Sequence, residues 1–321
     1  MKAENKKLTG GAESIISKLK GFTIYFIVVG IFIIFAIFLR DKGFLTLINL
    51  MNIFRQTAMI SIMAVGFTLL LASGEIDLSI GAVVALSALV GAVTLQKYGI
   101  IFAVLSALAV GAFVGFINGA FVVKLKMPSF LVTIATMSVV QGVARWTTQL
   151  RAIPIINTRF SFIFGSGNIG PISTLFIWTI VIVIIGHIVI SKTSFGRKVL
   201  AVGGNKTSAA FSGINVANVK WLLFVIMGIC AALAGLLYSG RLNAARYSYG
   251  ESDLLTVIAA VIIGGNSISG GKGTVLGALV GSIILGMINN GLIIFGLDVD
   301  KQIIFRGVII LVAVALSPKE T

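Results

Sequence analysis

Long apolar stretches separated by short polar segments run through nearly the whole chain. Most of them approach the length of about 20 residues that an α-helix needs to cross the hydrocarbon layer of a membrane. We expect the eighth stretch, which is short, to be broken or tilted. An even number of spans places both ends of the chain on the same side. The pattern predicts ten helices, over residues 21–39, 55–73, 80–95, 100–123, 129–147, 174–191, 217–239, 253–265, 274–295 and 302–317.

The composition agrees with a membrane protein rather than a soluble one. Hydrophobic residues make up 58% of the chain and charged residues 11%, whereas soluble domains carry about 25% charged residues. The 37 glycines suit such a protein because small residues let helices approach closely in lipid. We therefore expect an all-α, polytopic membrane protein with one transmembrane domain over residues 21–317 and short tails at 1–20 and 318–321.

The net charge of +15 does not indicate nucleic-acid binding. The basic residues are spread over the predicted helix ends rather than collected in one solvated domain. Short loops rich in Lys and Arg stay on the cytoplasmic side. The segment 192–220 decides the orientation because it is basic and contains no acidic residue, and it places both termini in the cytoplasm. The opposite loop, 148–173, is either a plain connector or the site of a short helix or a partner contact.

The sequence offers no set of residues typical of an enzyme. His187 and Cys230 lie in different predicted helices without other soft ligands, so no metal site is predicted. The glycine-rich segment 264–273 lacks the spacing of a phosphate-binding loop, in which Ser or Thr follows Lys, because Gly273 follows Lys272. We expect no cofactor on this chain and no ATP hydrolysis by it.

Two carboxylates, Glu75 and Asp77, lie between two apolar runs. A charge at membrane depth costs about 2.5–3.5 kcal/mol, so these residues either serve function or have structural partners. In the structural interpretation Asp77, followed by Ser79, is a helix N-cap, and Gly81 lets the start of that helix pack closely. No chain of ionisable residues crosses the predicted spans, and we therefore expect no coupling to a proton or sodium gradient.

The connection over residues 192–216 is far longer than the median of about 4–6 residues. Asn205 can cap a short helix that runs to Ser212, and Gly213 can end it. Such a helix would be amphipathic and would lie on the cytoplasmic face. We interpret it as a docking element, with a solvated charged loop as the alternative.

Glycines recur at intervals of four at two places, which puts each set on one helix face. Each set forms either a dimer seam or a packing surface within one subunit. Residues 111–119 also resemble residues 281–291, and an acidic turn precedes each. Because the two helices run in opposite directions, this similarity indicates an inverted internal repeat, with chance similarity between Gly- and Ile-rich spans as the alternative. The two sets are Gly111, Gly115 and Gly119, and Gly273, Gly277 and Gly281.

Five segments carry the most specific pattern of the chain: Gly74-Glu-Ile-Asp-Leu-Ser-Ile-Gly81, Gly203-Gly-Asn205, Ser212-Gly-Ile-Asn215, residues 259–274, and Gly286-Met-Ile-Asn-Asn-Gly-Leu292. Together, in order and over about residues 50–317, they resemble the membrane permeases of ribose-type ABC sugar importers. The chain departs from that family at two points. Glu75 stands where glycine is commoner, and Asn266-Ser267 replaces the more usual Thr-Ser.

The resemblance implies a ten-helix fold like that of the vitamin-B12-type (type II) importer permeases. Two permease chains, identical or paralogous, would pair in the bacterial inner membrane and bind a cytoplasmic ABC ATPase, which carries ATP and Mg. An extracytoplasmic sugar-binding protein would deliver a pentose-like monosaccharide such as ribose. The alternatives are a permease of the same kind for nucleosides, autoinducer-type furanones or polyols, and an ion-coupled secondary carrier.

The resemblance also implies roles for individual residues. Candidates for the translocation path are Glu75, Asp77, Ser79, Gly81, Asn118, Asn289 and Asn290. Residues expected to couple the permease to the ATPase are Gly196, Arg197, Gly203, Gly204, Asn205, Ala209, Ala210, Ser212, Gly213, Ile214 and Asn215.

Overall fold

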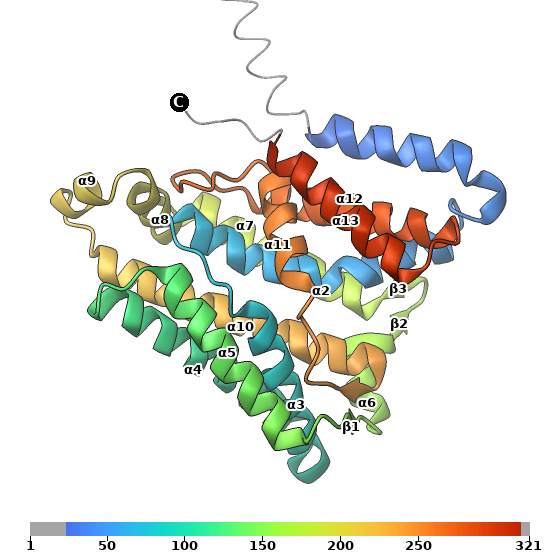
Figure 1. Cartoon of the computed structure of the whole chain (residues 1–321), viewed down its shortest axis with the longest axis horizontal. Helices are drawn as coiled ribbons and strands as arrows, with labels where there is room; N and C mark the ends of the chain where they lie inside the picture. The colour runs from blue at the N-terminus through green and yellow to red at the C-terminus, as the bar shows by residue number, and fades with distance from the viewer. Residues whose placement is uncertain (1–23, 316–321) are drawn as a thin grey trace, which may run out of the picture.

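The computed structural model describes residues 24–315, so the predicted tails at 1–20 and 318–321 lie outside the described residues. Within this range a helix lies at each of the ten predicted positions (Figure 1). Their bounds are Ile24–Phe38, α2 Leu47–Ala72, α3 Ile80–Tyr98, α4 Ile100–Lys124, α5 Ser129–Thr148, α7 Thr174–Lys192, α10 Val216–Leu242, α11 Asp253–Ile263, α12 Val275–Ile294 and α13 Val299–Ala315.

Six of these helices are long and apolar enough to cross a membrane, namely α2, α3, α4, α7, α10 and α12. The other four are shorter or less apolar. The protein is therefore a multi-pass helical membrane protein, and the count of ten membrane crossings stays a prediction.

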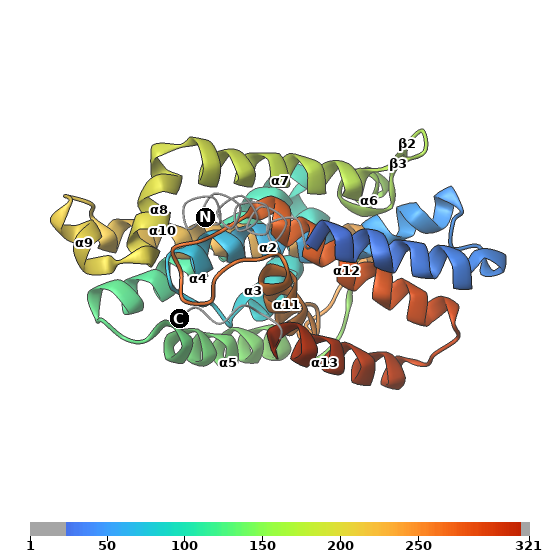
Figure 2. The ribbon, with the colours of Figure 1, turned by 90° about the horizontal axis from the view of Figure 1, so that it is seen from above.

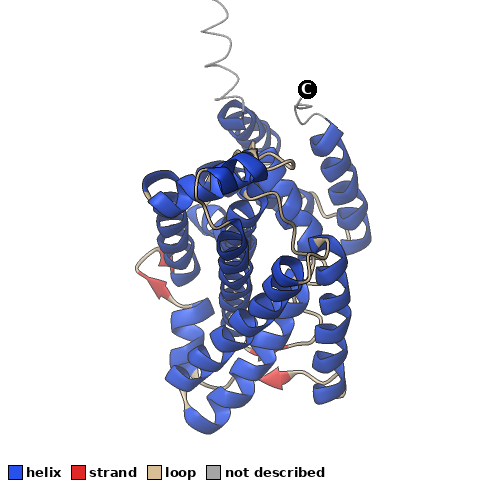
Figure 3. Cartoon of the chain, turned by 90° about the vertical axis from the view of Figure 1, so that its left-hand side faces the viewer, coloured by secondary structure: helices blue, strands red, loops and turns tan. Residues whose placement is uncertain are grey.

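Short elements occupy the connections between the long helices. They include two small antiparallel ladders, in which β1 pairs with β4 and β2 pairs with β3. Figure 3 shows how small a share of the chain these strands make up. The loop 148–173 carries short helical segments, as one of its two interpretations expected. The elements are η1 Arg40–Lys42, β1 Ile153–Pro154, α6 Thr158–Ser161, η2 Phe162–Ser166, β2 Asn168–Ile169, β3 Ile172–Ser173, α8 Ser194–Gly204, α9 Lys206–Phe211 and β4 Ala244–Ala245.

Helix α2 begins at Leu47, so the predicted start at residue 55 is wrong. The hydropathy pattern misses the first turns because they contain Asn49, Asn52 and Arg55. These polar side chains have partners inside the protein. The amides of Asn49 and Asn290 exchange two hydrogen bonds, of 3.1 and 2.9 Å, and Arg55 donates to Asn52 Oδ1 at 2.8 Å. Pairing of this kind removes much of the cost of placing polar groups in a helix bundle.

Helix α2 is the central element of the fold. Of its most apolar 18-residue window, 83% is buried inside the protein, against 28% for α4 and 33% for α7. It packs against α10, α12 and α7. Figure 2 shows α7 on one side of α2, with α5 and α13 on the other. Apolar side chains such as Phe113 on α4 are not covered by the rest of the chain, as expected for helices that face lipid.

The glycine sets pack helices together within the chain. A Cβ atom added at Gly111 or Gly115 of α4 would lie 2.2 Å from a carbonyl oxygen of α10, that of Gly228 or Phe224. Gly277 and Gly281 of α12 meet the backbone at residues 264 and 260 in the same way, and Gly119 lies against Trp221. Gly273 does not extend the second set, because it precedes the start of α12 at Val275.

We predict that Gly111→Ala destabilises the protein by about 1–3 kcal/mol, because the methyl group overpacks the contact between α4 and α10. Gly142→Ala on α5 is the matched control, since no atom beyond its own turn of helix lies within 4 Å of its added Cβ; the better helix propensity of Ala should leave stability equal or higher. Thermal unfolding of the two purified variants in detergent measures the difference. Equal midpoints would show that the α4–α10 contact tolerates a side chain.

Candidate functional site

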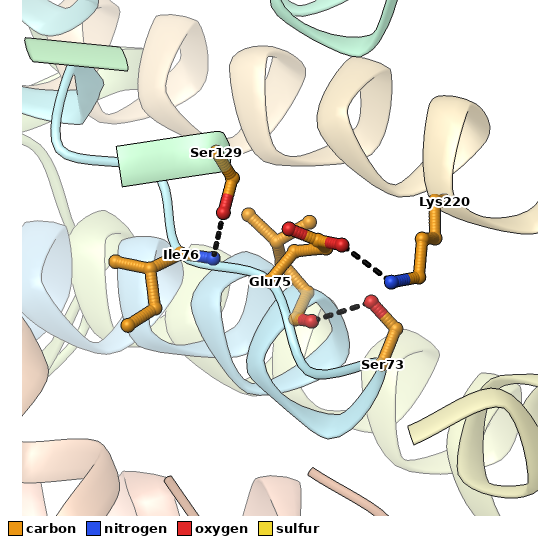
Figure 4. Close-up of polar contacts among 6 residues, drawn as sticks. Ser73, Glu75, Ile76, Ser129 and Lys220 are labelled. Atoms are coloured by element: carbon orange, nitrogen blue, oxygen red, sulfur yellow. Dashed lines mark hydrogen bonds and ion pairs between the residues drawn. The ribbon is translucent and has the colours of Figure 1, made fainter. Parts of the chain in front are cut away.

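The segment 73–79, which joins α2 to α3, is held from several sides. Glu75 forms an ion pair with Lys220 of α10, and only 13% and 12% of their side chains are exposed. Figure 4 shows this pair together with the bond from the backbone N–H of Ile76 to Ser129 Oγ, at 3.4 Å, at the start of α5. Helices α5 and α10 therefore both fix the position of the connection that carries the acidic motif.

Asp77 is almost completely buried, with 2% of its surface exposed. Its Oδ1 accepts hydrogen bonds from the backbone N–H and the hydroxyl of Ser79, at 2.7 and 2.6 Å. Asn118 of α4 donates to Ser79 Oγ at 3.0 Å and approaches Asp77 Oδ2 at 3.5 Å. Burial raises the pKa of the Asp77 carboxyl, and the bonds from Ser79 and Asn118 oppose that rise.

The prediction that Asp77 is the N-cap of the following helix is wrong. Helix α3 begins at Ile80, and its cap residue is Ser79, whose side chain makes no capping bond. Ser79 makes no capping bond because its hydroxyl donates to Asp77 and accepts from Asn118. Asp77 therefore stabilises the turn before the helix and not the helix end itself.

Gly81 lies where the two acidic connections of the chain meet. A Cβ at Gly81 would be 2.3 Å from the carbonyl oxygen of Gly250, which itself has a φ of +78°. The neighbouring Glu251 forms an ion pair with Arg145 of α5, at 2.9 Å. Asn118, which contacts Asp77, lies six residues before the end of α4, so this contact is about 9 Å inside the bundle. The connection 73–79 thus returns into the helix bundle before α3 begins.

Five glycines from three connections form a tight backbone contact, which we call the glycine junction: Gly74, Gly203, Gly204, Gly270 and Gly271. A Cβ at Gly203 would lie 1.9 Å from the carbonyl oxygen of Ala72, at the end of α2. The N–H of Gly271 donates to the same oxygen at 2.9 Å. The junction joins segments far apart in the sequence that the resemblance had singled out separately.

The predicted short helix in the connection 192–216 is present as α9. Asn205 caps it by accepting from the backbone N–H of Ser208 at 2.9 Å, and Gly213, with a φ of +78°, follows its end. Ala209 is buried, whereas the neighbouring Phe211 is 89% exposed. Helix α9 therefore presents a large apolar side chain that the described part of the chain does not cover.

Helix α8, which precedes α9, was not predicted. Thr193 caps it by accepting from the N–H of Gly196 at 3.0 Å, and Val199 and Val202 are buried at helical spacing. The capping residue Thr193 and the spacing of Val199 and Val202 are the features from which α8 could have been predicted. The last two residues of α8 are Gly203 and Gly204 of the glycine junction, so α8 physically connects α9 to the end of α2.

The other predicted coupling residues have distinct surroundings. Gly196 permits close contact with the carbonyl oxygens at the end of α7, 2.3 Å from its added Cβ. Asn215 caps α10 by accepting from the N–H of Asn218 at 3.0 Å, and Ile214 packs against the core. The remaining members, Arg197, Ala210 and Ser212, are exposed.

A polar pocket of about 120 Å³ lies between α2, α10, α11, α12 and α13. The hydroxyl of Tyr238 donates to Asp253 Oδ2 at 2.6 Å, and Arg306 Nη2 donates to Asn289 Oδ1 at 3.3 Å. Gln56 also lines the pocket, and its side-chain oxygen is buried without a hydrogen-bond partner. An apolar helix bundle here encloses a group of donors and acceptors, which is typical of a site for a small polar molecule.

Of the predicted path residues only Asn289 lines the pocket; Asn290 pairs with Asn49, and Asn118 lies beside Asp77. Asp253 and Arg306, two ionisable residues that the sequence pattern did not single out, also line this pocket. Sequence reasoning missed the site because its residues come from five helices. The residues that the structure describes contain no His, Cys, Asp or Glu cluster suited to a metal ion.

The described helices form a multi-pass membrane bundle that contains a pocket lined partly by polar side chains. The chain belongs to the family described as branched-chain amino acid transport system / permease component, whose model matches residues 49–314.

Curated relatives cover nearly the whole chain. The chain is 37% identical over 295 residues to the ribose import permease protein RbsC of Bacillus subtilis (strain 168), covering 91% of this chain and 92% of the relative. It is 35% identical over 288 residues to the protein of the same name in Haemophilus influenzae, covering 88% and 89%. It is 34% identical over 336 residues to the galactose/methyl galactoside import permease protein MglC of Escherichia coli (strain K12), covering 99% and 98%. No solved structure matches the chain significantly.

We predict that Asp77→Asn keeps transport near normal and that Asp77→Ala does not. The Asn oxygen can still accept from Ser79, and its amide can donate to Asn118 Oδ1, a buried oxygen without a partner, once the Asn118 amide, whose nitrogen now faces Asp77, turns over. Ala leaves the buried N–H of Ser79 unsatisfied, at a cost of about 1–3 kcal/mol. Uptake and expression of both variants in cells provide the measurement. Loss of uptake in Asp77→Asn at normal expression would mean that the charge itself matters.

Proposed function

We propose that this chain is the membrane permease subunit of an ATP-driven ABC importer that moves a monosaccharide, ribose or a similar pentose, into the cytoplasm. The observation that carries this proposal is the glycine junction. It connects an exposed short helix, α9, through α8 to the end of the central helix α2. A movement imposed on α9 can therefore reach the core of the bundle without passing through flexible loops.

The names of the relatives support a sugar as the solute. The first relatives are ribose import permeases, and a galactose/methyl galactoside permease also aligns over almost the full length. A pentose fits the closer similarity to the ribose permeases. Nucleosides, autoinducer-type furanones and polyols are the alternative solutes.

Helix α9 is the proposed docking element for a separate cytoplasmic ABC ATPase, which binds ATP and Mg. Phe211 offers an apolar anchor, the kind of residue that contributes most to binding when a partner covers it. The basic residues around α8 and α9, including Lys192, Arg197 and Lys198, support a cytoplasmic position for this face. Both termini are then cytoplasmic, and an extracytoplasmic sugar-binding protein delivers the solute to the opposite face.

The finer architecture that we propose is the type II fold of ten spans with an inverted repeat, with two chains paired in the bacterial inner membrane. Two ion pairs support the repeat. Glu75 of the first half pairs with Lys220 of the second, and Glu251 of the second half pairs with Arg145 of the first. The two connections that carry these glutamates meet at Gly81 and Gly250. Paired connections of this kind are expected where related halves face each other in a transporter.

Transport then follows from alternating access. ATP binding and hydrolysis on the partner favour one arrangement of the helices and then the other. Each shift requires that the nucleotide-bound partner has a different affinity for the two arrangements of the permease. The permease supplies the path and the coupling, and the partner supplies the free energy.

The proposal predicts uptake that depends on ATP and not on an ion gradient. The permease, its ATPase and its binding protein are reconstituted in liposomes with ATP inside, and an ionophore collapses all gradients. Labelled ribose should still accumulate, and accumulation should stop when ATP is withheld. Asp253 makes this test important, because a buried carboxylate is what an ion-coupled carrier would use. Uptake by the permease alone under an imposed gradient would favour that carrier.

We further predict that Phe211→Asp abolishes co-purification of the ATPase. The substitution replaces an exposed apolar anchor by a charge and leaves the buried Ala209 untouched, so the fold should survive. Ile156→Asp is the matched control, because Ile156 is 83% exposed and lies in the opposite connection. Affinity purification of tagged permease from the membrane compares the two variants. Undiminished recovery of the ATPase with Phe211→Asp would exclude this docking site.

A further inference from the structure

The short helix α9 is connected to the end of α2 from both of its own ends. On one side, α8 reaches Ala72 through the glycine junction. On the other side, residues 212–215 lead directly into α10, and Lys220 of α10 forms the ion pair with Glu75. Because Ala72 and Glu75 are three residues apart, both routes arrive at the same short stretch of the chain.

The route from α9 to Lys220 is stiff. The backbone N–H of Ile214 donates to the carbonyl oxygen of Ala209 at 3.1 Å, and the side chain of Ile214 packs against the core. Lys220 follows the cap residue Asn215 by five positions, which is about 7.5 Å along α10. A displacement of α9 therefore moves Lys220 and is not absorbed by a flexible loop.

The connection 73–79 is held separately by α5. Ser129 and Thr133 accept hydrogen bonds from its backbone N–H groups at 3.4 and 3.0 Å. Helices α4 and α10, which pack together at the glycines of α4, contribute one contact each to the connection, from Asn118 and from Lys220. A displacement of α10 can thus part the ion pair while α5 keeps the connection in place.

The ion pair is sheltered but not sealed from water. The side chains of Lys220 and Glu75 are 12% and 13% exposed, against 51% and 37% for Arg145 and Glu251, the other ion pair between the halves. Separating sheltered charges is unfavourable unless each of them reaches water. The lysine charge is compact and strongly hydrated, and it lies on a flexible stem. The pair therefore has two defined states, one joined and sheltered, the other parted and hydrated.

The bundle is closed around the end of α2 that carries this pair. Every residue of α2 from Ser61 to Ala72 is buried. Ser73, which lies close to the pair in Figure 4, is 1% exposed, and its hydroxyl donates to the carbonyl oxygen of Leu70 at 2.7 Å. The joined ion pair thus belongs to an arrangement that is closed on the side of α9.

We propose that the ion pair between Glu75 and Lys220 is a latch. Joined, it holds the α9 side of the bundle closed; it parts when α9 is displaced, and that side then opens. The place of the latch in transport rests on the proposed function, because the ATPase supplies the displacement. The protection that the joined pair gives to the end of α2 does not require the ATPase, so the permease alone can be used to measure it.

The test measures how fast a thiol at position 73 reacts. Ser73→Cys is made together with Cys230→Ala, which removes the one cysteine of the chain, and this parent protein is placed at full length in lipid nanodiscs. Iodoacetamide, a small neutral reagent, labels the thiol when the end of α2 becomes accessible. Labelling of the parent should be slow, because the residue at this position is buried.

Lys220→Met should label about tenfold faster or more, because Glu75 is left without a partner and the open arrangement becomes favoured. Removal of a cation makes a nearby thiolate less stable and would by itself slow the reaction, so faster labelling reports exposure. The reversed pair, Glu75→Lys with Lys220→Glu, should restore slow labelling. A merely structural role of either residue does not predict rescue by reversed charges.

Arg145→Met is the matched control, because it breaks the other ion pair between the halves and should label as slowly as the parent. Thermal unfolding of all the variants identifies a general loss of stability. The latch is rejected if Lys220→Met labels no faster than the parent, if the reversed pair labels as fast as Lys220→Met, or if Arg145→Met accelerates labelling equally.

The assembled complex separates this inference from the proposed function and needs no change of charge. With the ATPase and the binding protein present, ATP should accelerate labelling of the parent protein, because a displaced α9 parts the pair. ATP-driven ribose uptake with unchanged labelling would reject the latch and leave the importer intact. Fast labelling of Lys220→Met and slow labelling of the reversed pair, without any ATP-driven uptake by the complex, would reject the importer and retain the latch.

Discussion

Close contact between backbones at glycine positions is the constraint on which this structure depends. Helices in lipid gain little from hydrophobic burial against one another, so they are held by packing and by polar contacts. Here α4 meets α10 at Gly111 and Gly115, and α12 meets α11 at Gly277 and Gly281. In each case an added Cβ would fall near 2 Å from a carbonyl oxygen. Close approach of backbones at glycines in the connections likewise forms the glycine junction at the end of α2.

The two acidic connections share a further feature, because both return into the bundle and both are tied to the other half of the chain. Glu75 and Glu251 form ion pairs with residues of the opposite half. Breaking a largely buried pair such as Glu75–Lys220 costs more than making it gains, since a charge is left without a partner. Such pairs therefore fix the relative position of the halves more than they add to stability. This property suits a protein whose halves must occupy defined arrangements.

Helix α2 links the polar pocket to the glycine junction. Its first half contributes Gln56 to the polar pocket, and its last residue, Ala72, accepts a hydrogen bond in the glycine junction. Because it is buried and packs against α7, α10 and α12, a shift at one end cannot be absorbed by a loose neighbour. A stiff helix of this kind can transmit a movement from the glycine junction to the helices around the pocket.

The sequence by itself determined the helices, the class of protein and the short helix α9. Hydropathy runs, the caps at Asn205 and Gly213 and the positions of the glycines are local properties, and local properties can be derived from neighbouring residues. Predictions from neighbouring residues failed where a side chain has its hydrogen-bond partner in a distant part of the chain. In the first turns of α2, Asn49 pairs with Asn290 of α12, and Asn118 of α4 contacts the turn that Asp77 and Ser79 form. Only the tertiary structure decided that Gly74, Gly203 and Gly271 meet, and that Asp253, Asn289 and Arg306 line one pocket. No spacing along the chain encodes such a meeting, because it depends on how separate helices pack in three dimensions.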